Sequence, residues 1–216
     1  MKFPSLPALL AVAVLANTSA LAQAHGGVTH ATAAPATNQL AQADAALRDL
    51  WLEHCFWVRN VVLATTAGNT AAAAAAEANV VRNAQQIANA MEVFYGKAAA
   101  ENLFSLLAGH YGAVKQYLLA AVLQDRVQQD AARATMGENA GKLASFLAAA
   151  NPNLPRDAVL GMLLAHGDHH ILQIDQLRDK QYVDEAQTWM DMKSHMYAVA
   201  DALAGALSQQ FPDKFR

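Results

Sequence analysis

The chain has 216 residues, and its 15 lysines and arginines against 18 aspartates and glutamates give a formal net charge of −3 at pH 7. Hydrophobic residues make up 54% of it, enough to bury a sizeable core, and the lack of a basic run argues against nucleic acid as a partner. The single cysteine, Cys55, excludes an internal disulfide, and we interpret it as a small buried hydrophobic residue.

The first residues are typical of a secretory signal peptide, which we place at residues 1–24. Lys2 precedes a short apolar run over residues 6–15, and Ala22-Gln23-Ala24 matches an A-x-A cleavage site. We therefore expect a periplasmic or secreted protein whose mature chain begins at His25. Because no later segment reads as a membrane span, we expect no membrane contact after cleavage.

Three later stretches carry apolar residues at helical spacing, and a histidine stands inside each of them. These histidines are His54, His110 and His166. Alanine is abundant and clusters of β-branched residues are scarce, which favours an all-α fold. We predict a flexible linker over residues 25–42 and a single helical-bundle domain over residues 43–216.

The three histidines are 56 residues apart, and the segments before them agree: LWLEH, LLAGH and MLLAH. A second polar set follows the same period, at Asn83, Asn139 and His195. RNAQQIANAM over residues 82–91 also aligns with ENAGKLASFL over residues 138–147. We interpret this register as three copies of a helical hairpin, joined without gaps.

Turn signals fall midway between the polar residues of successive helices. They are Gly68-Asn69, Gly96, residues 124–130, residues 151–155 and residues 179–184, where we assign Asp184 as the helix N-cap. The sequence thus predicts an up-and-down bundle of about six helices, built as three helical hairpins with a 56-residue period. A residue midway between two turns lies at mid-height on its helix, so the six polar residues should share one layer.

Imidazoles that meet at one height form a ligand set suited to zinc, copper or iron. His166 and His170 are four residues apart on one helix, so both can face the same ion. We predict that a transition metal is held by His54, His110, His166 and His170. The residues expected to orient these ligands, or to border the site, are Asn83, Asn139, His195 and Arg59.

Two other interpretations of this layer stay open. In the first, the histidines and asparagines only fix helix register, in a protein that binds a partner or a small ligand. In the second, the layer lines a cleft for a small ligand or holds a general-base histidine. The chain has no G-x-S-x-G motif and no phosphate-binding glycine loop, so we assign no catalytic residue and favour a protein that is not an enzyme.

The sequence also makes predictions for four further residues. His169 falls off the apolar stripe and is expected to be exposed. Arg59 is expected to pair with Glu53 or Asp201, or to face a cleft. In the C-terminal segment QQFPDKF, Phe211 and Phe215 are expected to dock on the bundle.

Several blocks resemble a group of small all-helical bacterial proteins that lack an established activity and are sometimes named glycosyltransferases. The blocks are LWLEHCFWVRN, NVVRNAQQIANAMEVFYG, LLAGHYGAVKQYL, NAGKLASFLAAANP, MLLAH and QQFPDKF. The likeness covers about residues 47–215 and implies a helical fold with a polar set at His54, Arg59, Asn83, His110, Asn139 and His166. A glycosyltransferase would need alternating strands and helices, and this sequence does not predict them.

The segment HGDHHILQI, residues 166–174, is also similar to part of the DinB-like superfamily of metalloenzymes. There a His-x-x-x-His pair, followed by R-G-Q-I, supplies two of three metal ligands. The corresponding residues here are His166, His170, Gln173 and Ile174, with Ile171-Leu172 in place of Arg-Gly. The resemblance implies a metal-dependent enzyme as the alternative function.

Overall fold

The computed structural model describes residues 36–215, with side chains from residue 39. Within this range the protein is all-α, as predicted. The helices are α1 (Ala36–Thr66), α2 (Thr70–Tyr95), α3 (Lys97–Val122), α4 (Arg126–Ala150), α5 (Arg156–Arg178) and α6 (Tyr182–Gln210), and a 3-10 turn, η1 (Pro212–Phe215), follows. The signal peptide predicted at residues 1–24, and His25, lie outside the described residues. Helix α1 begins at Ala36, inside the segment 25–42 that was predicted as a linker.

The helix ends follow local chemistry. Asn69 caps α2 by accepting a hydrogen bond from the main-chain amide of Ala72, and Asp125 caps α4 in the same way. Gly96 adopts a φ of 80° between α2 and α3, a conformation that favours glycine. The assignment of Asp184 as an N-cap was wrong, because α6 already begins at Tyr182 and Asp184 lies in its first turn. A carboxylate there still favours the helix dipole.

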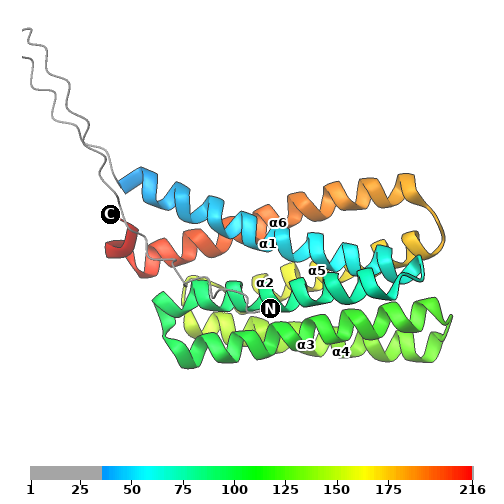
Figure 1. The fold of residues 1–216 in the computed structure, drawn as a ribbon. Coiled ribbons are helices and arrows are strands. Elements are labelled where there is room, and N and C mark those ends of the chain that lie inside the picture. Colours follow the sequence, from blue (N-terminus) through cyan, green and yellow to red (C-terminus); the bar gives the residue numbers. More distant parts are fainter. Residues whose placement is uncertain (1–35, 216) are drawn as a thin grey trace, which may run out of the picture. The chain divides into compact units, whose positions relative to one another are not determined.

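The six helices form a closed ring in which each one packs against its neighbours in the chain. Helix α6 completes the ring by packing along α1, and α5 also contacts α3 and α1 across the interior (Figure 1). Because the connections are short, α1, α3 and α5 run parallel to one another and the even-numbered helices run the opposite way. Equivalent residues of the three hairpins therefore come to similar heights.

Small buried residues recur at equivalent positions of the even-numbered helices, where they allow neighbouring helices to approach closely. Ala88, Ala144 and Ala200 are 56 residues apart, and none of them is exposed. The buried apolar residues form two clusters, one containing Ile87 and Leu143 and the other containing Val58 and Val114. Between these clusters lies the layer of polar residues.

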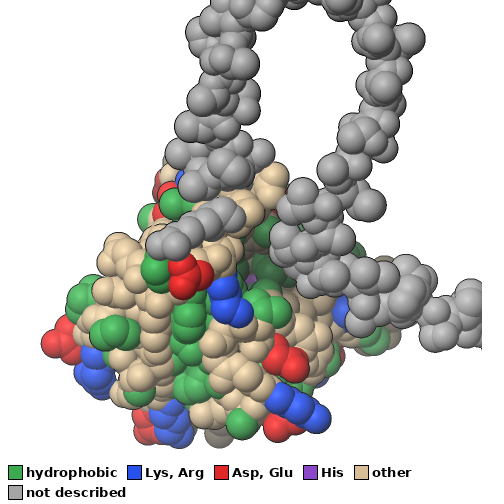
Figure 2. Space-filling view, turned by 90° about the vertical axis from the view of Figure 1, so that its left-hand side faces the viewer, with side chains coloured by type: hydrophobic (Ala, Val, Ile, Leu, Met, Phe, Trp, Pro, Cys, Tyr) green, Lys and Arg blue, Asp and Glu red, His purple; other side chains and the backbone are tan. Residues whose placement is uncertain are grey.

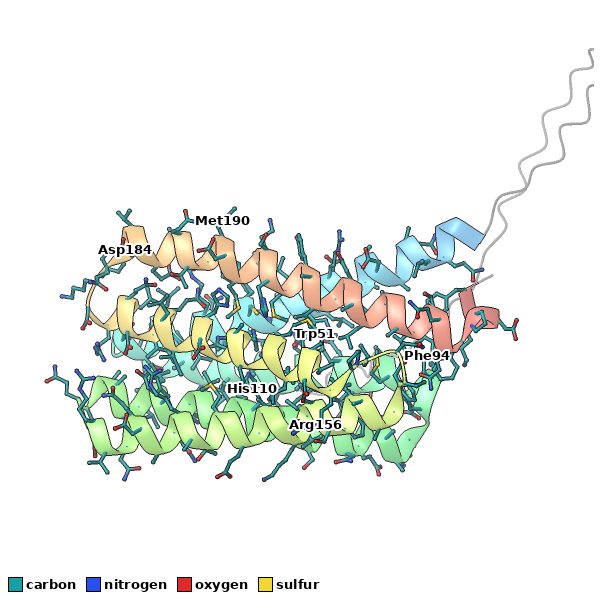
Figure 3. The ribbon with its side chains drawn as sticks, turned by 180° about the vertical axis from the view of Figure 1, so that it is seen from behind. Trp51, Phe94, His110, Arg156, Asp184 and Met190 are labelled. Carbon is teal, nitrogen blue, oxygen red and sulfur yellow. The ribbon has the colours of Figure 1, made fainter. Side chains whose placement is uncertain are left out.

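Several side-chain predictions are confirmed. Cys55 is fully buried, and burial raises the pKa of its thiol. The rings of Phe211 and Phe215 lie 5.4 and 5.9 Å from that of Phe94. Figure 3 places Phe94 near the C-terminal end of the chain, and His110 half-way along the bundle.

On the end that Figure 2 shows, acidic and basic side chains are interspersed with apolar and uncharged surface. Among the described helices, none combines the length and the apolar character that crossing a membrane requires.

Candidate metal centre

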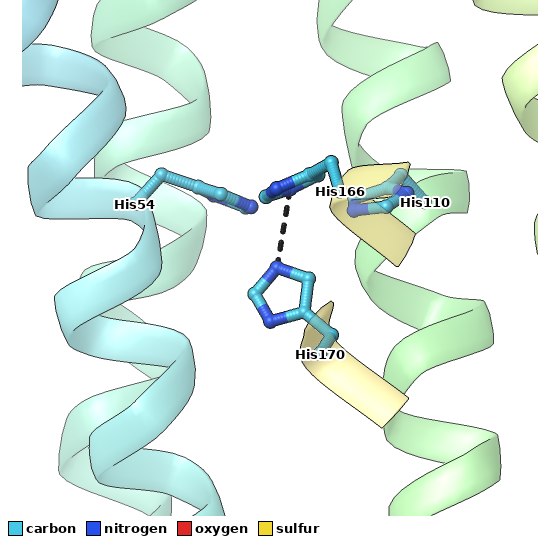
Figure 4. A group of neighbouring side chains, drawn as sticks. All are labelled: His54, His110, His166 and His170. Carbon is cyan, nitrogen blue, oxygen red and sulfur yellow. Dashed lines mark hydrogen bonds between the residues drawn. The ribbon is translucent and has the colours of Figure 1, made fainter. Parts of the chain in front are cut away.

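The histidines of the three hairpins meet in the interior of the bundle. The rings of His54 and His110 are 6.0 Å apart, and His166 lies 5.8 Å from the first and 5.3 Å from the second. They come from α1, α3 and α5, the three parallel helices. Figure 4 shows these three rings at one level, so the predicted convergence is observed.

A fourth histidine, His170, lies one helical turn beyond this level. Its ring is 5.9 Å from those of both His54 and His110, and 4.4 Å from that of His166 (Figure 4). The equivalent positions of the other two hairpins hold Val58 and Val114, both buried. His170 thus departs from the repeat and adds a ligand on one side of the other three.

The geometry suits an ion bound by imidazoles. One nitrogen from each of the four rings can be chosen so that all four lie within 4.8 Å of one another. On one ion at 2.0–2.1 Å, two nitrogens would be about 3.4 Å apart at a tetrahedral angle and at most about 4.2 Å apart when opposite. Binding would thus draw the rings together by no more than about 1.4 Å.

All four imidazoles are buried, with 2–5% of their surface exposed. Burial, with a further contribution from His110, lowers the pKa of His54 to about 3, and burial lowers that of His110 to about 4. The pKa values of His166 and His170 are also lowered, first by burial and then by the neighbouring histidines. The rings are therefore neutral at pH 7, the state in which imidazole binds metals.

Several ring nitrogens in the group have no hydrogen-bond partner within the described part of the chain. They are Nδ1 of His54, Nε2 of His110 and Nδ1 of His166. The Nε2 atoms of His166 and His170 are 3.1 Å apart and share one hydrogen bond. A buried polar atom without a partner costs free energy, so these nitrogens are suited to a ligand.

The second polar set bonds to the main chain. The side-chain amides of Asn83 and Asn139 each donate a 3.0 Å hydrogen bond to the main-chain oxygens of Leu50 and Leu106. Nε2 of His195 lies 2.9 Å from the main-chain oxygen of Met162. Each acceptor lies four residues before a site histidine.

These three contacts repeat one geometry, because each joins residues 33 apart in the chain. They tie each even-numbered helix to its partner one turn before the histidine. Asn83, Asn139 and His195 thus set helix height. Within the described residues, the side-chain amide of Asn83 also donates a hydrogen bond to Glu53.

Arg59 pairs with a residue other than the two predicted for it. Its guanidinium donates two hydrogen bonds of 2.6 Å to the carboxylate of Glu185 on α6. The prediction of a pair with Glu53 or Asp201 was wrong, because Glu53 accepts from Trp57 and Asp201 pairs with Arg48. The amide of Gln173 also donates to Glu185.

His169 was predicted to be exposed, and this was wrong. It is half-buried, and its ring lies 5.4 Å from that of His195. The antiparallel packing of α6 on α5 covers this side of the helix. His169 does not belong to the group of four ligand candidates.

Comparisons with protein-family models, with curated proteins and with solved structures found no match for this chain.

Proposed function

We propose that this protein binds a single transition-metal ion through His54, His110, His166 and His170. The observation that carries this proposal is the set of four buried imidazoles whose nitrogens approach within 4.8 Å. Three of those rings hold a buried nitrogen without a partner in the described residues. An ion at the centre of the group would bond to one nitrogen of each ring.

A purely structural polar layer is the competing explanation. The hydrogen bonding of the four clustered histidines argues against it. Such a layer stabilises a fold when its members are hydrogen-bonded. Asn83, Asn139 and His195 meet this need through bonds to main-chain oxygens, although Oδ1 of Asn83 and of Asn139 has no partner within the described residues. The four clustered histidines share one bond, between His166 and His170. Leaving buried polar atoms unpaired costs about 1–3 kcal/mol each.

The donor set favours an ion of low charge. All four ligands are neutral, so the bound complex keeps the full charge of its ion inside an apolar core. The free-energy cost of burying an ion rises steeply with the magnitude of its charge. Among copper, zinc and iron, we therefore place Cu(I) first, ahead of Zn(II) and Fe(II).

Elemental analysis and titration test this proposal directly. The full chain, purified without a histidine tag, is titrated under anaerobic conditions with Cu(I), Zn(II) and Fe(II). We expect one equivalent of one of these ions to bind. His54→Ala and His110→Ala are expected to lose stoichiometric binding. His169→Ala is the matched control, because it removes a neighbouring imidazole outside the group and should retain the ion.

The outcomes separate the alternatives. Metal that persists in both His54→Ala and His110→Ala would place the ion elsewhere in the chain. No affinity for any of the three ions would leave the structural layer as the explanation.

The predicted signal peptide further supports acquisition of the ion outside the cytoplasm, which metal analysis of a periplasmic fraction would test.

A further inference from the structure

An apolar cavity lies directly against the three histidines that share one level. His54, His110 and His166 form part of its wall. Next to them along α1, α3 and α5 stand Trp51, Leu107 and Leu163, which are equivalent residues of the three hairpins. Met91, Leu147 and Leu203, equivalent residues of α2, α4 and α6, extend the wall. The cavity thus lies where the three hairpins meet.

The fourth histidine is on the other side of this level. Trp51, Leu107 and Leu163 come one turn before the three histidines, whereas His170 comes one turn after His166 on α5. His170 does not line the cavity. An ion held by the four imidazoles would therefore have its fourth ligand on one side and the cavity on the other.

The size and walls of the cavity select a class of ligand. It offers about 30 Å³ to the centres of water-sized molecules, and one water needs roughly 10–15 Å³ on this scale. Its lining beyond the histidines is hydrophobic, so an anion would find no charged side chain there and only the ion itself as a partner. A largely apolar cavity of this size takes up small uncharged molecules.

One lining residue adds a hydrogen-bond donor. The indole N–H of Trp51 is buried and has no acceptor within the described residues, and its ring lies 6.4 Å from that of His54. A small molecule with a terminal lone pair that reaches this N–H would supply the acceptor it lacks, which a fully apolar molecule would not.

We propose that the bound metal receives a small uncharged diatomic molecule through this cavity, on the side opposite His170, as a fifth ligand of Fe(II) or, on four-coordinate Cu(I), in exchange for the bond to His170. This inference rests on the proposed metal function and names the ligand class of the same site. It concerns binding only. Dioxygen, carbon monoxide and nitric oxide share the required size, neutrality and lone pairs.

Carbon monoxide is the reporter of choice, because it coordinates both Cu(I) and Fe(II). The full chain is loaded with the ion it binds, exposed to carbon monoxide, and followed by the infrared C–O stretch. The metal-free protein is examined in parallel by xenon NMR, which reports on the cavity without the ion. We expect a C–O band in the loaded protein and a xenon shift in the metal-free protein.

The filling variant is Leu163→Phe, with Leu107→Phe as its equivalent in the second hairpin. Each should keep stoichiometric metal but weaken carbon monoxide and xenon binding at least tenfold. Leu160→Phe is the matched control. It makes the same change on the same helix outside the cavity, at a position where the second hairpin already carries Phe104. It should behave as the unaltered protein does.

Each result decides between the two proposals. Stoichiometric Cu(I) or Fe(II) without a C–O band, or a band unchanged in both filling variants, would overturn the diatomic ligand and leave the metal site standing. Binding of Zn(II) alone would overturn it too. If no ion binds, the metal function fails and this inference fails with it, whatever xenon shows.

Discussion

The Nε2 atoms of His166 and His170 lie 3.1 Å apart across one turn of α5. At this distance they cannot both carry a proton, so one donates and the other accepts. The pair exists in the third hairpin alone, because Val58 and Val114 hold the equivalent positions of the other two. The fourth ligand of the proposed site is therefore a local departure from the repeat.

Restoring the repeat at this position should separate metal binding from folding. His170→Val introduces the residue that the first two hairpins already bury there. We expect the affinity for the ion to fall at least about tenfold, a loss of about 1.4 kcal/mol, measured by competition with a chelator. The melting temperature of the metal-free variant should stay within a few degrees of the unaltered protein. Equal affinity in the two proteins would remove His170 from the ligand set.

The hydrogen bond between Asn139 and the main chain should make a side chain at Gly109 of α3 destabilising. A Cβ at Gly109 would lie 2.9 Å from Nδ2 of Asn139, whereas one at Gly112 meets nothing within 4 Å. Alanine in place of glycine stabilises a free helical site by about 0.5–1 kcal/mol. Gly112→Ala should show this gain in urea denaturation. Gly109→Ala should be less stable than Gly112→Ala by about 1–2 kcal/mol, because it displaces a buried hydrogen bond.

A double substitution checks the cause of that difference. In a background of Asn139→Ala, the steric conflict is gone, and Gly109→Ala should cost much less. A penalty that persists in this background would mean that Gly109 is required for another reason.

The metal-free protein should lose stability in mild acid. The pKa values of His54 and His110 fall to about 3 and about 4 on burial, against about 6.5 in an unfolded chain. Between these values the unfolded state binds more protons, so the free energy of unfolding falls as the pH falls. In this pH range, each histidine that stays neutral in the folded protein lowers the free energy of unfolding by about 1.4 kcal/mol for each unit that the pH falls. We expect constant stability above about pH 7.5 and a steep loss from about pH 6.5 to pH 4.

Thermal denaturation over this pH range measures the effect. His110→Leu should show a shallower decline, since it removes one of the titrating groups from the core. An identical decline in both proteins would contradict a buried neutral His110.

The ion pair of Arg59 and Glu185 should contribute far more to stability than the ion pair made by the equivalent residue of the second hairpin. Glu185 is buried, and Arg59→Leu would leave its carboxylate without a charge partner. We expect a loss of about 3 kcal/mol or more in urea denaturation. Lys115, the equivalent of Arg59, pairs with the more exposed Glu77, so Lys115→Leu should cost no more than about 1 kcal/mol.

The second substitution at this pair tests the explanation. Arg59→Leu with Glu185→Leu removes both charges, and most of the lost stability should return. A double variant as unstable as the single one would show that the charge of Glu185 is not the cause.

Helical periodicity and the 56-residue register were sufficient to predict the helices, their hairpins and the convergence of His54, His110 and His166. The reason is geometric. A helix rises by a constant amount per residue, so distance from a turn sets the height of a side chain. Equal spacing in the sequence therefore becomes equal height in the bundle, before any packing detail is known.

Partners across the bundle could not be predicted in this way. Asn83 bonds to the carbonyl of Leu50, Arg59 reaches Glu185 on the last helix, and His169 is half-buried against α6. These contacts depend on how α6 closes the ring and on the rotation of each helix about its axis. Sequence spacing determines height along the bundle, but only the packing of all six helices determines which side chains meet across it.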